Sequence, residues 1–247
     1  MPGSRSSKSN DFERSTRMKK FLAALCSSLL LAGILPARAA DMDKLNDRLN
    51  SAAEVIKEVM AAPDKGIPSS ILSGAACVVV VPAYKKGAFV VGAQYGQGVA
   101  TCRTPRGWSA PVFVRLTGGS VGWQIGGQST DLVLVAMNQR GLQSMLKSKV
   151  KLGGDASVAA GPVGRNAQAA TDIAMNAQFL TYSRAKGIFA GLSLDGTVLD
   201  QNKDDMIAEY GSAIPFETVL HGMTPVPPNA TRFVSTVARY FVIAKSR

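Results

Sequence analysis

The sequence predicts an α+β fold, in which a central antiparallel or mixed β-rich layer is flanked by helices at the N- and C-terminal ends. Three observations lead to this prediction. An amphipathic helical pattern covers residues 43–61, β-branched segments with glycine-bearing turns fill the middle of the chain, and helical patterns return near the C-terminus. Because the strands gather in the centre instead of alternating with helices, a doubly wound parallel sheet is disfavoured.

The N-terminal helix is predicted from its apolar stripe, which includes Leu45, Leu49, Ile56 and Val59. Pro63 ends the pattern. Such a stripe packs on a protein core or lies on a membrane, and both interpretations are open. The opposite face mixes acidic and basic side chains, which favours packing on the core over an anionic membrane.

The central strands and the remaining helices follow from local patterns. The candidate strands are 77–81, 88–95, 98–103, 112–116, 120–125, 131–137, 147–151, 173–182 and 187–194. The candidate helices are 67–72, a short helix capped by Asn138, one from Asp204 to Tyr210, one at 215–220, and a last one starting at Asn229. In the segment 147–151, alternation points three lysines to one side.

The first 39 residues read as a secretory signal peptide. Basic residues precede an apolar run from Phe21 to Leu35, and Ala37-Arg38-Ala39 offers a small-x-small cleavage site. The run is short for a membrane span, which needs about 20 apolar residues. Residues 1–17 are unpatterned, which leaves open that they are an artefact of start-site choice. We therefore expect a single mature domain over 40–247, periplasmic, envelope-associated or secreted.

The charge of the mature chain is mildly basic. Residues 1–39 hold seven basic and two acidic residues, so their removal lowers the formal net charge from +11 to +6. That charge is spread along the chain and suits an anionic membrane surface or simple solubility. It is too dispersed to predict a nucleic-acid partner.

Two cysteines remain in the mature chain, Cys77 and Cys102. In an oxidising compartment they are a possible disulfide pair, which stabilises by closing a long loop. Two buried free thiols are the alternative, because spacing alone does not bring the Cα atoms within reach.

The densest glycine cluster of the chain lies between Gly118 and Gln128 and runs into the apolar segment that begins at Asp131. Glycines at this density permit close approach of two backbones or positive φ. No Gly-Lys-Ser/Thr ending follows, so this is not a phosphate loop. We expect the segment to be structural before it is functional.

Three blocks of sequence resemble the SYLF-domain family, also known as lipid-binding or yeast actin-patch, actin-binding domains. They are Gly118–Gln128 with the following strand, Tyr182–Gly196, and Cys77–Pro82 with the later Lys86–Phe89, in the family's order. The resemblance runs from about Gly66 to Gly211. It marks these positions as motif residues: Gly118, Gly119, Gly122, Gln124, Gly126, Gln128, Asp131, Ser183, Lys186, Gly187, Gly191, Asp195 and Gly196. It implies a non-enzymatic domain that binds acidic lipids and, in eukaryotic members, actin.

Residue types argue against an enzyme, a cofactor or a metal site. His221 is the only histidine, and neither a Gly-x-Ser-x-Gly elbow nor a His-Glu-x-x-His motif occurs. Ser144 and Lys147 match Ser-x-x-Lys, but the companion motifs of penicillin-type enzymes are absent. An EF-hand loop starting at Asp200 fails at its glycine and glutamate positions, which leaves turn and capping carboxylates or a looser oxygen site.

Basic residues in turns beside strands are the candidates for contact with lipid head groups, because a cation there meets phosphate without desolvating a core. They are Lys85, Lys86, Arg103, Arg106, Arg184 and Lys186. Solvated turns are the alternative interpretation. The sequence therefore predicts an exported, non-catalytic domain that binds acidic phospholipid or another amphiphile, and a protein-interaction or scaffold module is the alternative.

Overall fold

The computed structural model describes residues 35–61, 66–88, 91–121, 126–163, 176–185, 188–190 and 194–242. The chain divides into two compact units, residues 1–43 and 44–247. Helix α2 (Leu35–Ala61) begins in the first unit and continues into the second.

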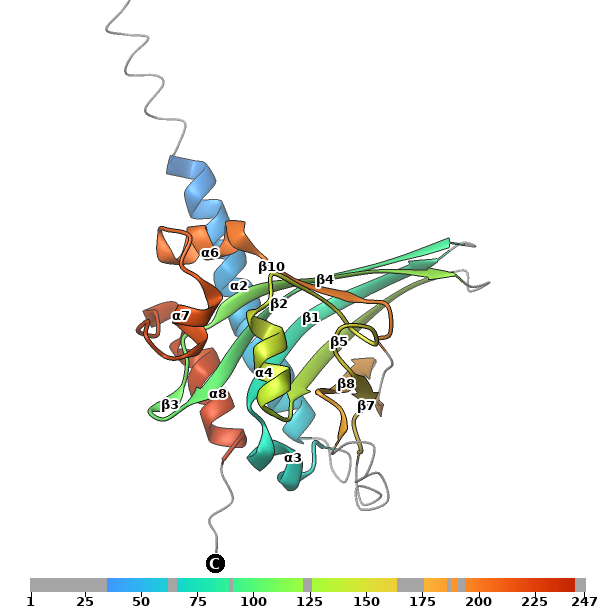
Figure 1. Cartoon of the computed structure of the whole chain (residues 1–247). Helices are drawn as coiled ribbons and strands as arrows, with labels where there is room; N and C mark the ends of the chain where they lie inside the picture. Colours follow the sequence, from blue (N-terminus) through green and yellow to red (C-terminus); the bar gives the residue numbers. More distant parts are fainter. Residues whose placement is uncertain are drawn as a thin grey trace, which may run out of the picture. The chain divides into compact units, whose positions relative to one another are not determined.

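Among the residues that the structure describes, the second unit is built on one ten-stranded sheet (Figure 1). Its strands are β1 (Cys77–Ala88), β2 (Val91–Thr104), β3 (Gly107–Trp108), β4 (Val112–Val121), β5 (Gly126–Ala136), β6 (Lys149–Lys151), β7 (Val158–Ala160), β8 (Phe179–Ala185), β9 (Ile188–Ala190) and β10 (Val198–Gln201). The order is β6-β10-β4-β2-β1-β5-β8-β7, with β3 beside β2 and β9 beside β8. All pairs are antiparallel except β7 with β8.

Helices precede and follow the central strands, and one, α4, lies between β5 and β6 in the chain. Besides α2 they are α3 (Ser69–Gly74), α4 (Gln139–Leu146), α6 (Lys203–Tyr210), α7 (Phe216–Leu220) and α8 (Thr231–Tyr240), with a 3₁₀ turn over Pro228–Ala230. The predicted α+β class with a mixed sheet is confirmed. None of the helices in the described part of the chain is long and apolar enough to cross a bilayer.

The glycines of β2 were interpreted as a turn between two strands, but the structure has one continuous strand there. The break between 95 and 98 does not exist, and β2 runs through it. A Cβ atom on Gly96 would lie 2.7 Å from the Tyr84 ring, and one on Gly98 would lie 2.5 Å from the Val80 carbonyl oxygen. These glycines therefore allow close approach of β1, where the pattern was interpreted as a turn. Likewise Ser120 belongs to the end of β4 and does not begin a new strand.

A bulge in β1 sets which side chains share a face of the sheet. The register of β1 shifts against both neighbours between Val80 and Lys85. Within it Ala83 has φ of +52°, and its backbone N–H donates to Oδ1 of Asp131 on β5 at 3.0 Å. A non-glycine residue at positive φ costs about 1–2 kcal/mol, which the Asp131 bond offsets. Asp131 thus has a structural role in the glycine-rich block.

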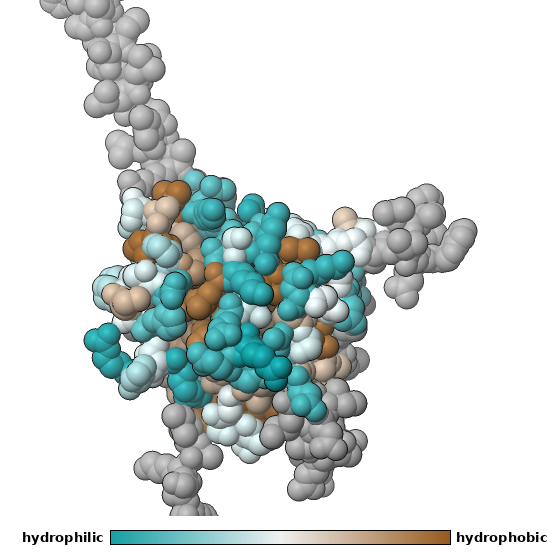
Figure 2. Space-filling view, in the orientation of Figure 1, coloured by the Kyte–Doolittle hydropathy of each residue, from teal (hydrophilic) through white to brown (hydrophobic). Residues whose placement is uncertain are grey.

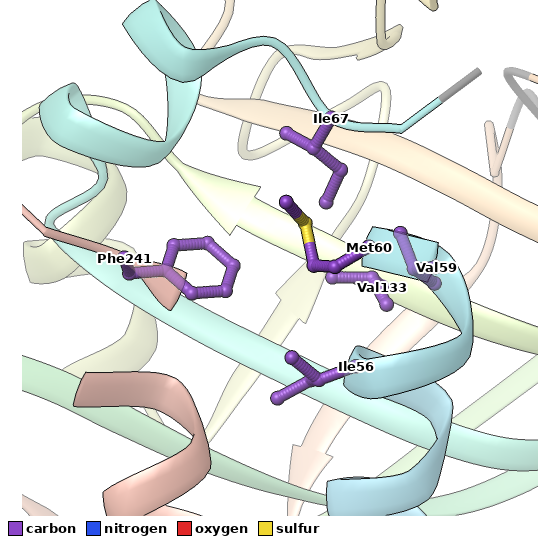
Figure 3. A pocket seen from close by; sticks show the side chains of 6 residues that line it. All are labelled: Ile56, Val59, Met60, Ile67, Val133 and Phe241. Atoms are coloured by element: carbon purple, nitrogen blue, oxygen red, sulfur yellow. The ribbon is translucent and has the colours of Figure 1, made fainter. Parts of the chain in front are cut away.

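Helix α2 packs on the sheet, which confirms the core-packing interpretation of its apolar stripe. Leu45, Leu49, Ala52, Ile56 and Val59 are each at most 2% exposed. Figure 3 shows its last turns against the sheet and the C-terminal segment, around a small apolar space that has no room for a water molecule. The side chains that line this space are Ile56, Val59, Met60, Ile67, Val133 and Phe241.

Polar contacts fix α2 along its length. Arg48 pairs with Asp205 at the start of α6 and donates to Gln97 on β2 at 2.8 Å. Further along the helix, Glu58 pairs with Arg184 on β8. Since the helix is held by residues from distant parts of the strand order, α2 is an integral part of the domain.

The two cysteines of the mature chain are bonded to each other. Cys77 on β1 and Cys102 on β2 are partners in the ladder, with their Cα atoms 4.0 Å apart, and the structure has a disulfide between them. Both residues are fully buried. Of the two alternatives left open by the sequence, the disulfide is the one that the structure shows.

Three helices differ from the prediction in their first residue or in their capping residue. Helix α2 begins at Leu35, eight residues before the predicted Asp43, with Pro36 tolerated in its first turn. Asn202, not Asp204, caps α6, because its side chain accepts the backbone N–H of Asp205. The last α-helix begins at Thr231, after a 3₁₀ turn around Asn229.

Candidate functional site: a basic sheet face and the four-stranded arm beside it

The distal parts of four neighbouring strands form an extension of the sheet, here called the arm. It consists of 84–88 of β1, 91–95 of β2, 117–121 of β4 and 126–130 of β5. In Figure 1 these strand ends run together away from the helices. By sequence, the arm strands contain Lys85 and Lys86 and no acidic residue.

The cross-strand registers assign the arm's side chains to faces, because residues paired across strands lie on the same face. One row runs through Ser129, Lys85, Tyr95, Thr117, Val198 and Lys151. A second row, two residues along, runs through Gln97, Arg115, Asp200 and Lys149. Because Arg48 of α2 bonds to Gln97, α2 packs on this same face, here called the α2 face.

The α2 face is open to solvent beyond the helix. Lys85, Thr117, Ser129 and Lys151 are exposed. Tyr95 is 46% exposed, which is unusual for an aromatic side chain in a strand of this sheet. An aromatic ring with a polar tip beside cations suits the boundary between water and lipid head groups.

A polar hollow of about 430 Å³ lies on the α2 face. Its lining consists of Arg115, Ser148, Lys149, Asp200, Gln201, Lys203 and Asp204. Arg115 and Asp200 form an ion pair at 3.5 Å, with 36% and 24% of their side chains exposed. The three cations come from β4, β6 and α6 and outnumber the two carboxylates, so the hollow favours an anionic group.

Sequence reasoning missed this hollow. Lys149 and Lys151 belong to the alternating segment whose lysines were predicted to share one side, and the structure confirms that both are exposed around buried Val150. The sequence offered no signal that β6 lies beside β10, and through it beside Arg115, because these pairings join residues far apart in the chain.

The predicted lipid-binding residues do not gather in one place. Lys85 lies on the α2 face and Lys86 on the other face of β1, where partial burial lowers the pKa of its ammonium group. Arg184 pairs with Glu58, and its Nη1 atom lies 3.7 Å from Oδ2 of Asp131. Lys186 lies outside the described residues.

Arg103 and Arg106 lie at the far end of β2 from the arm. The Arg103 guanidinium donates to the carbonyls of Ala75 and Phe241 at 3.1 and 2.9 Å and stacks over the Trp108 ring. Burial lowers the pKa of Arg103. Arg106 is exposed and donates to the Gly222 carbonyl at 2.9 Å. These contacts make Arg103 a packing residue that ties α3 and the C-terminal segment to the sheet.

The family-motif residues that the structure describes have mostly backbone and packing roles. A Cβ atom on Gly118 would lie 3.3 Å from Thr197 Oγ1, and Gly196 sits in a turn at φ +80°. A Cβ atom on Gly119 would make only an ordinary contact, 3.9 Å from the Gly92 carbonyl oxygen. Gly126 opens β5, Gln128 and Asp195 are exposed, and Ser183 is buried in β8. The motif positions that lie outside the described residues are Gly122, Gln124, Lys186, Gly187 and Gly191.

Two carboxylates of the segment tested as an EF-hand loop make contacts within the fold. Asp200 pairs with Arg115, and Asp205 with Arg48 and the cap residue Asn202. Among the described residues, no group of histidine, cysteine and acidic side chains is arranged to hold a metal ion. His221 is exposed in the turn after α7.

The opposite face of the sheet carries α4 and differs in character. Figure 2 views that face, where hydrophilic side chains lie over the strands with apolar ones scattered between them. Gly141 of α4 sits where a Cβ atom would lie 3.0 Å from Ala136, so this helix packs closely on β5. Helix α4 thus packs on this face beside β5, and the hollow with Lys149 lies on the α2 face.

A known protein family matches most of this architecture from the arm to the last helix. The family model described as "Ysc84: Las17-binding protein actin regulator" matches residues 117–240, from the arm's β4 to the end of α8. The chain belongs to the Ysc84 family. The family's description is of a binding protein and regulator, and names no reaction.

Relatives of this Ysc84-family chain include eukaryotic proteins. Human "SH3 domain-containing YSC84-like protein 1" is 33% identical over 193 residues, which is 75% of this chain and 56% of that protein. An SH3 domain-containing protein of Schizosaccharomyces pombe is 36% identical over 168 residues, and "Protein YSC84" of Saccharomyces cerevisiae is 30% identical over 195. The chain spans about half the length of these relatives, with 56%, 39% and 42% of each covered.

Proposed function

We propose that this Ysc84-family chain is exported and binds acidic phospholipid, or another amphiphile with an anionic head group, at the cell envelope through the α2 face. The observation that carries the proposal is the convergence of Arg115, Lys149 and Lys203 on one open hollow. Lys85, Lys151 and Tyr95 extend the same face along the arm. The protein acts as a binding domain and not as a catalyst.

Charge supplies the attraction. A lysine near an anionic membrane surface contributes about 1 kcal/mol, and this contribution falls off within a Debye length. Asp200 and Asp204 offset part of it, so the hollow selects an anionic group that also accepts a hydrogen bond from the Ser148 hydroxyl.

Export is supported by the N-terminal sequence and by the disulfide. Residues 19–39 have the basic, apolar and small-x-small order of a secretory signal. Cys77 and Cys102 form a buried cross-strand disulfide, a bond that persists in oxidising compartments. Peptide mass fingerprinting of the native protein should find an N-terminus at or near Ala40, and a full-length cytoplasmic product would contradict export.

A protein-binding or scaffold role is the second candidate. It is favoured by the family's description as a Las17-binding protein and actin regulator. Under that role the α2 face would engage a protein, and lipid composition would have no influence.

Vesicle sedimentation separates the two candidates. Vesicles of phosphatidylglycerol with phosphatidylcholine should capture the protein over 40–247, phosphatidylcholine alone much less, and salt should weaken capture. Lys149→Gln with Lys151→Gln should weaken capture by about tenfold to thirtyfold, at about 1 kcal/mol per lysine.

The matched control lies on α4, on the opposite face. Arg140→Gln with Gln143→Glu lowers the net charge by the same two units at exposed positions and should leave capture nearly unchanged. Equal loss in both double variants would mean that net charge alone governs binding. Equal capture by neutral and anionic vesicles would remove the head-group proposal and favour the protein-binding role.

A further inference from the structure

The outer edge of the arm on β5 has backbone groups that no described strand pairs. Residues Gly126 to Thr130 pair with β1 on one side, from Gly126 opposite Ala88 to Thr130 opposite Tyr84. On the other side, pairing with β8 begins only at Asp131, opposite Arg184. Within the described part of the chain, β8 therefore pairs with no residue of β5 before Asp131. Five residues of β5 extend beyond that pairing. These five residues are here called the β5 edge.

The β5 edge lacks the features by which proteins protect an open edge. Natural edges carry lysine, proline, bulges or inward charges that discourage a further strand. The β5 edge reads Gly126-Gly127-Gln128-Ser129-Thr130, with no charge and no proline. Its length of five residues corresponds to about 17 Å of extended chain, enough for an added strand of ordinary size.

Charge indicates what kind of strand would join. Lys85 is the ladder partner of Ser129 and Lys86 that of Gln128, so consecutive lysines lie one strand inward and on opposite faces. An added strand would run about 10 Å from β1, two strand spacings, within reach of a lysine and an acidic side chain that extend toward each other. Ser129 is short and leaves the path from Lys85 open on its face. The arm strands contain no acidic residue to compete.

We propose that the β5 edge is the docking site for an extended, acidic peptide segment of a partner protein, which joins the sheet as an additional strand beside β5. Backbone hydrogen bonds supply affinity, as in strand addition to other open sheet edges, and Lys85 and Lys86 select acidic side chains on both faces of the added strand. This site shares Lys85 with the α2 face but none of the residues that line the hollow around Arg115 and Lys149, so it adds a protein contact to the proposed membrane contact.

The arm contains its own control. Among the described strands, the end of β4, 118–121, forms the arm's opposite edge, because β10 pairs with β4 only from Val114 to Thr117. That edge pairs with β2, in which Gln94 and Ala93 lie opposite Gly118 and Gly119, so no lysine flanks it. A partner recognised by both open backbone and lysines should choose the β5 edge.

Hydrogen exchange with mass spectrometry tests the proposal on the protein over 40–247. The probe is a synthetic octapeptide of glutamate pairs alternating with valine pairs, which places glutamates on both faces of an added strand. It is compared with the lysine–valine peptide of the same pattern and with a glutamate peptide in which prolines replace the valines. The glutamate–valine probe should slow exchange at 126–130 and leave 118–121 unchanged. The lysine and proline peptides should protect neither edge, because one lacks the charge and the other the backbone donors.

A binding measurement completes the test. By fluorescence polarisation, Lys85→Gln with Lys86→Gln should weaken the glutamate–valine probe by about fivefold to thirtyfold, from up to about 1 kcal/mol per exposed ion pair. Absence of protection at 126–130, equal protection of both edges, or protection by anionic vesicles but not by the peptide would overturn the proposal. The Lys149→Gln with Lys151→Gln variant, which should lose vesicle capture, should bind the glutamate–valine probe as the parent protein does. The membrane proposal and the peptide proposal can therefore fail separately.

Discussion

Replacing Gly98 by alanine should destabilise the domain, because this glycine lets β2 approach β1. A Cβ atom there would lie 2.5 Å from the Val80 carbonyl oxygen and 2.7 Å from Val81 Cγ2, whereas ordinary contacts of a Cβ atom begin at about 3.4 Å. The oxygen belongs to the backbone of a buried central strand, so a shift of nearly 1 Å must pass into the ladder between β1 and β2. Overpacking of this kind costs about 1–3 kcal/mol.

Thermal unfolding followed by circular dichroism measures this cost. For a domain of this size each kcal/mol shifts Tm by about 2–4 °C, so Gly98→Ala should lower Tm by about 2–12 °C. Gly87→Ala is the matched control, since a Cβ atom on this exposed glycine of β1 would meet nothing within 4 Å. It should leave Tm unchanged or raise it slightly, because alanine reduces the entropy of the unfolded chain. Equal Tm values for the two variants would refute the close-approach explanation of the glycines in β2.

Two further predictions concern the disulfide and a half-buried carboxyl group. The disulfide joins residues separated by 25 positions, and closing a loop of this length stabilises by about 3–3.5 kcal/mol. Cys77→Ala with Cys102→Ala should therefore lower Tm by about 10 °C. An unchanged Tm would show that the bond does not constrain the unfolded chain. Burial raises the pKa of Glu209 above its ordinary 4.5, although its hydrogen bond from Asn229 acts the other way. A raised pKa in the folded state means that stability is lost as pH rises through that pKa. Glu209→Gln should therefore raise Tm at pH 7, and the gain should vanish below the ordinary pKa of glutamate; a gain that persists at pH 3 would contradict this assignment.

Local patterns sufficed to predict most of the elements and the fold class. Asn138 caps α4 as predicted, since its side chain accepts the backbone N–H of Gly141. The apolar stripe of α2 faces the core, as the spacing of Leu45 and Ile56 indicates. These features depend on neighbours within one or two turns, which the sequence displays directly.

The site depends on contacts between distant residues, and therefore the sequence did not reveal it. Arg103 looked like a turn cation, but its guanidinium reaches the Phe241 carbonyl, 138 residues away. Lys149 meets Asp200, and through it Arg115, only because β10 inserts between β6 and β4. Glycines such as Gly98 have two physical uses, turn and close approach, and only the neighbouring strand decides between them.

The most direct test of the α2 face as a membrane surface is a fluorescent label placed on it. The chain over 40–247 has only Cys77 and Cys102, which are bonded to each other, so an introduced cysteine is labelled alone. An environment-sensitive nitrobenzoxadiazole label at Thr117→Cys, between Tyr95 and Val198 on the α2 face, should brighten and shift to the blue when phosphatidylglycerol vesicles are added. The same label at Gln143→Cys on α4 should stay unchanged, and a response at Gln143 without one at Thr117 would contradict the account.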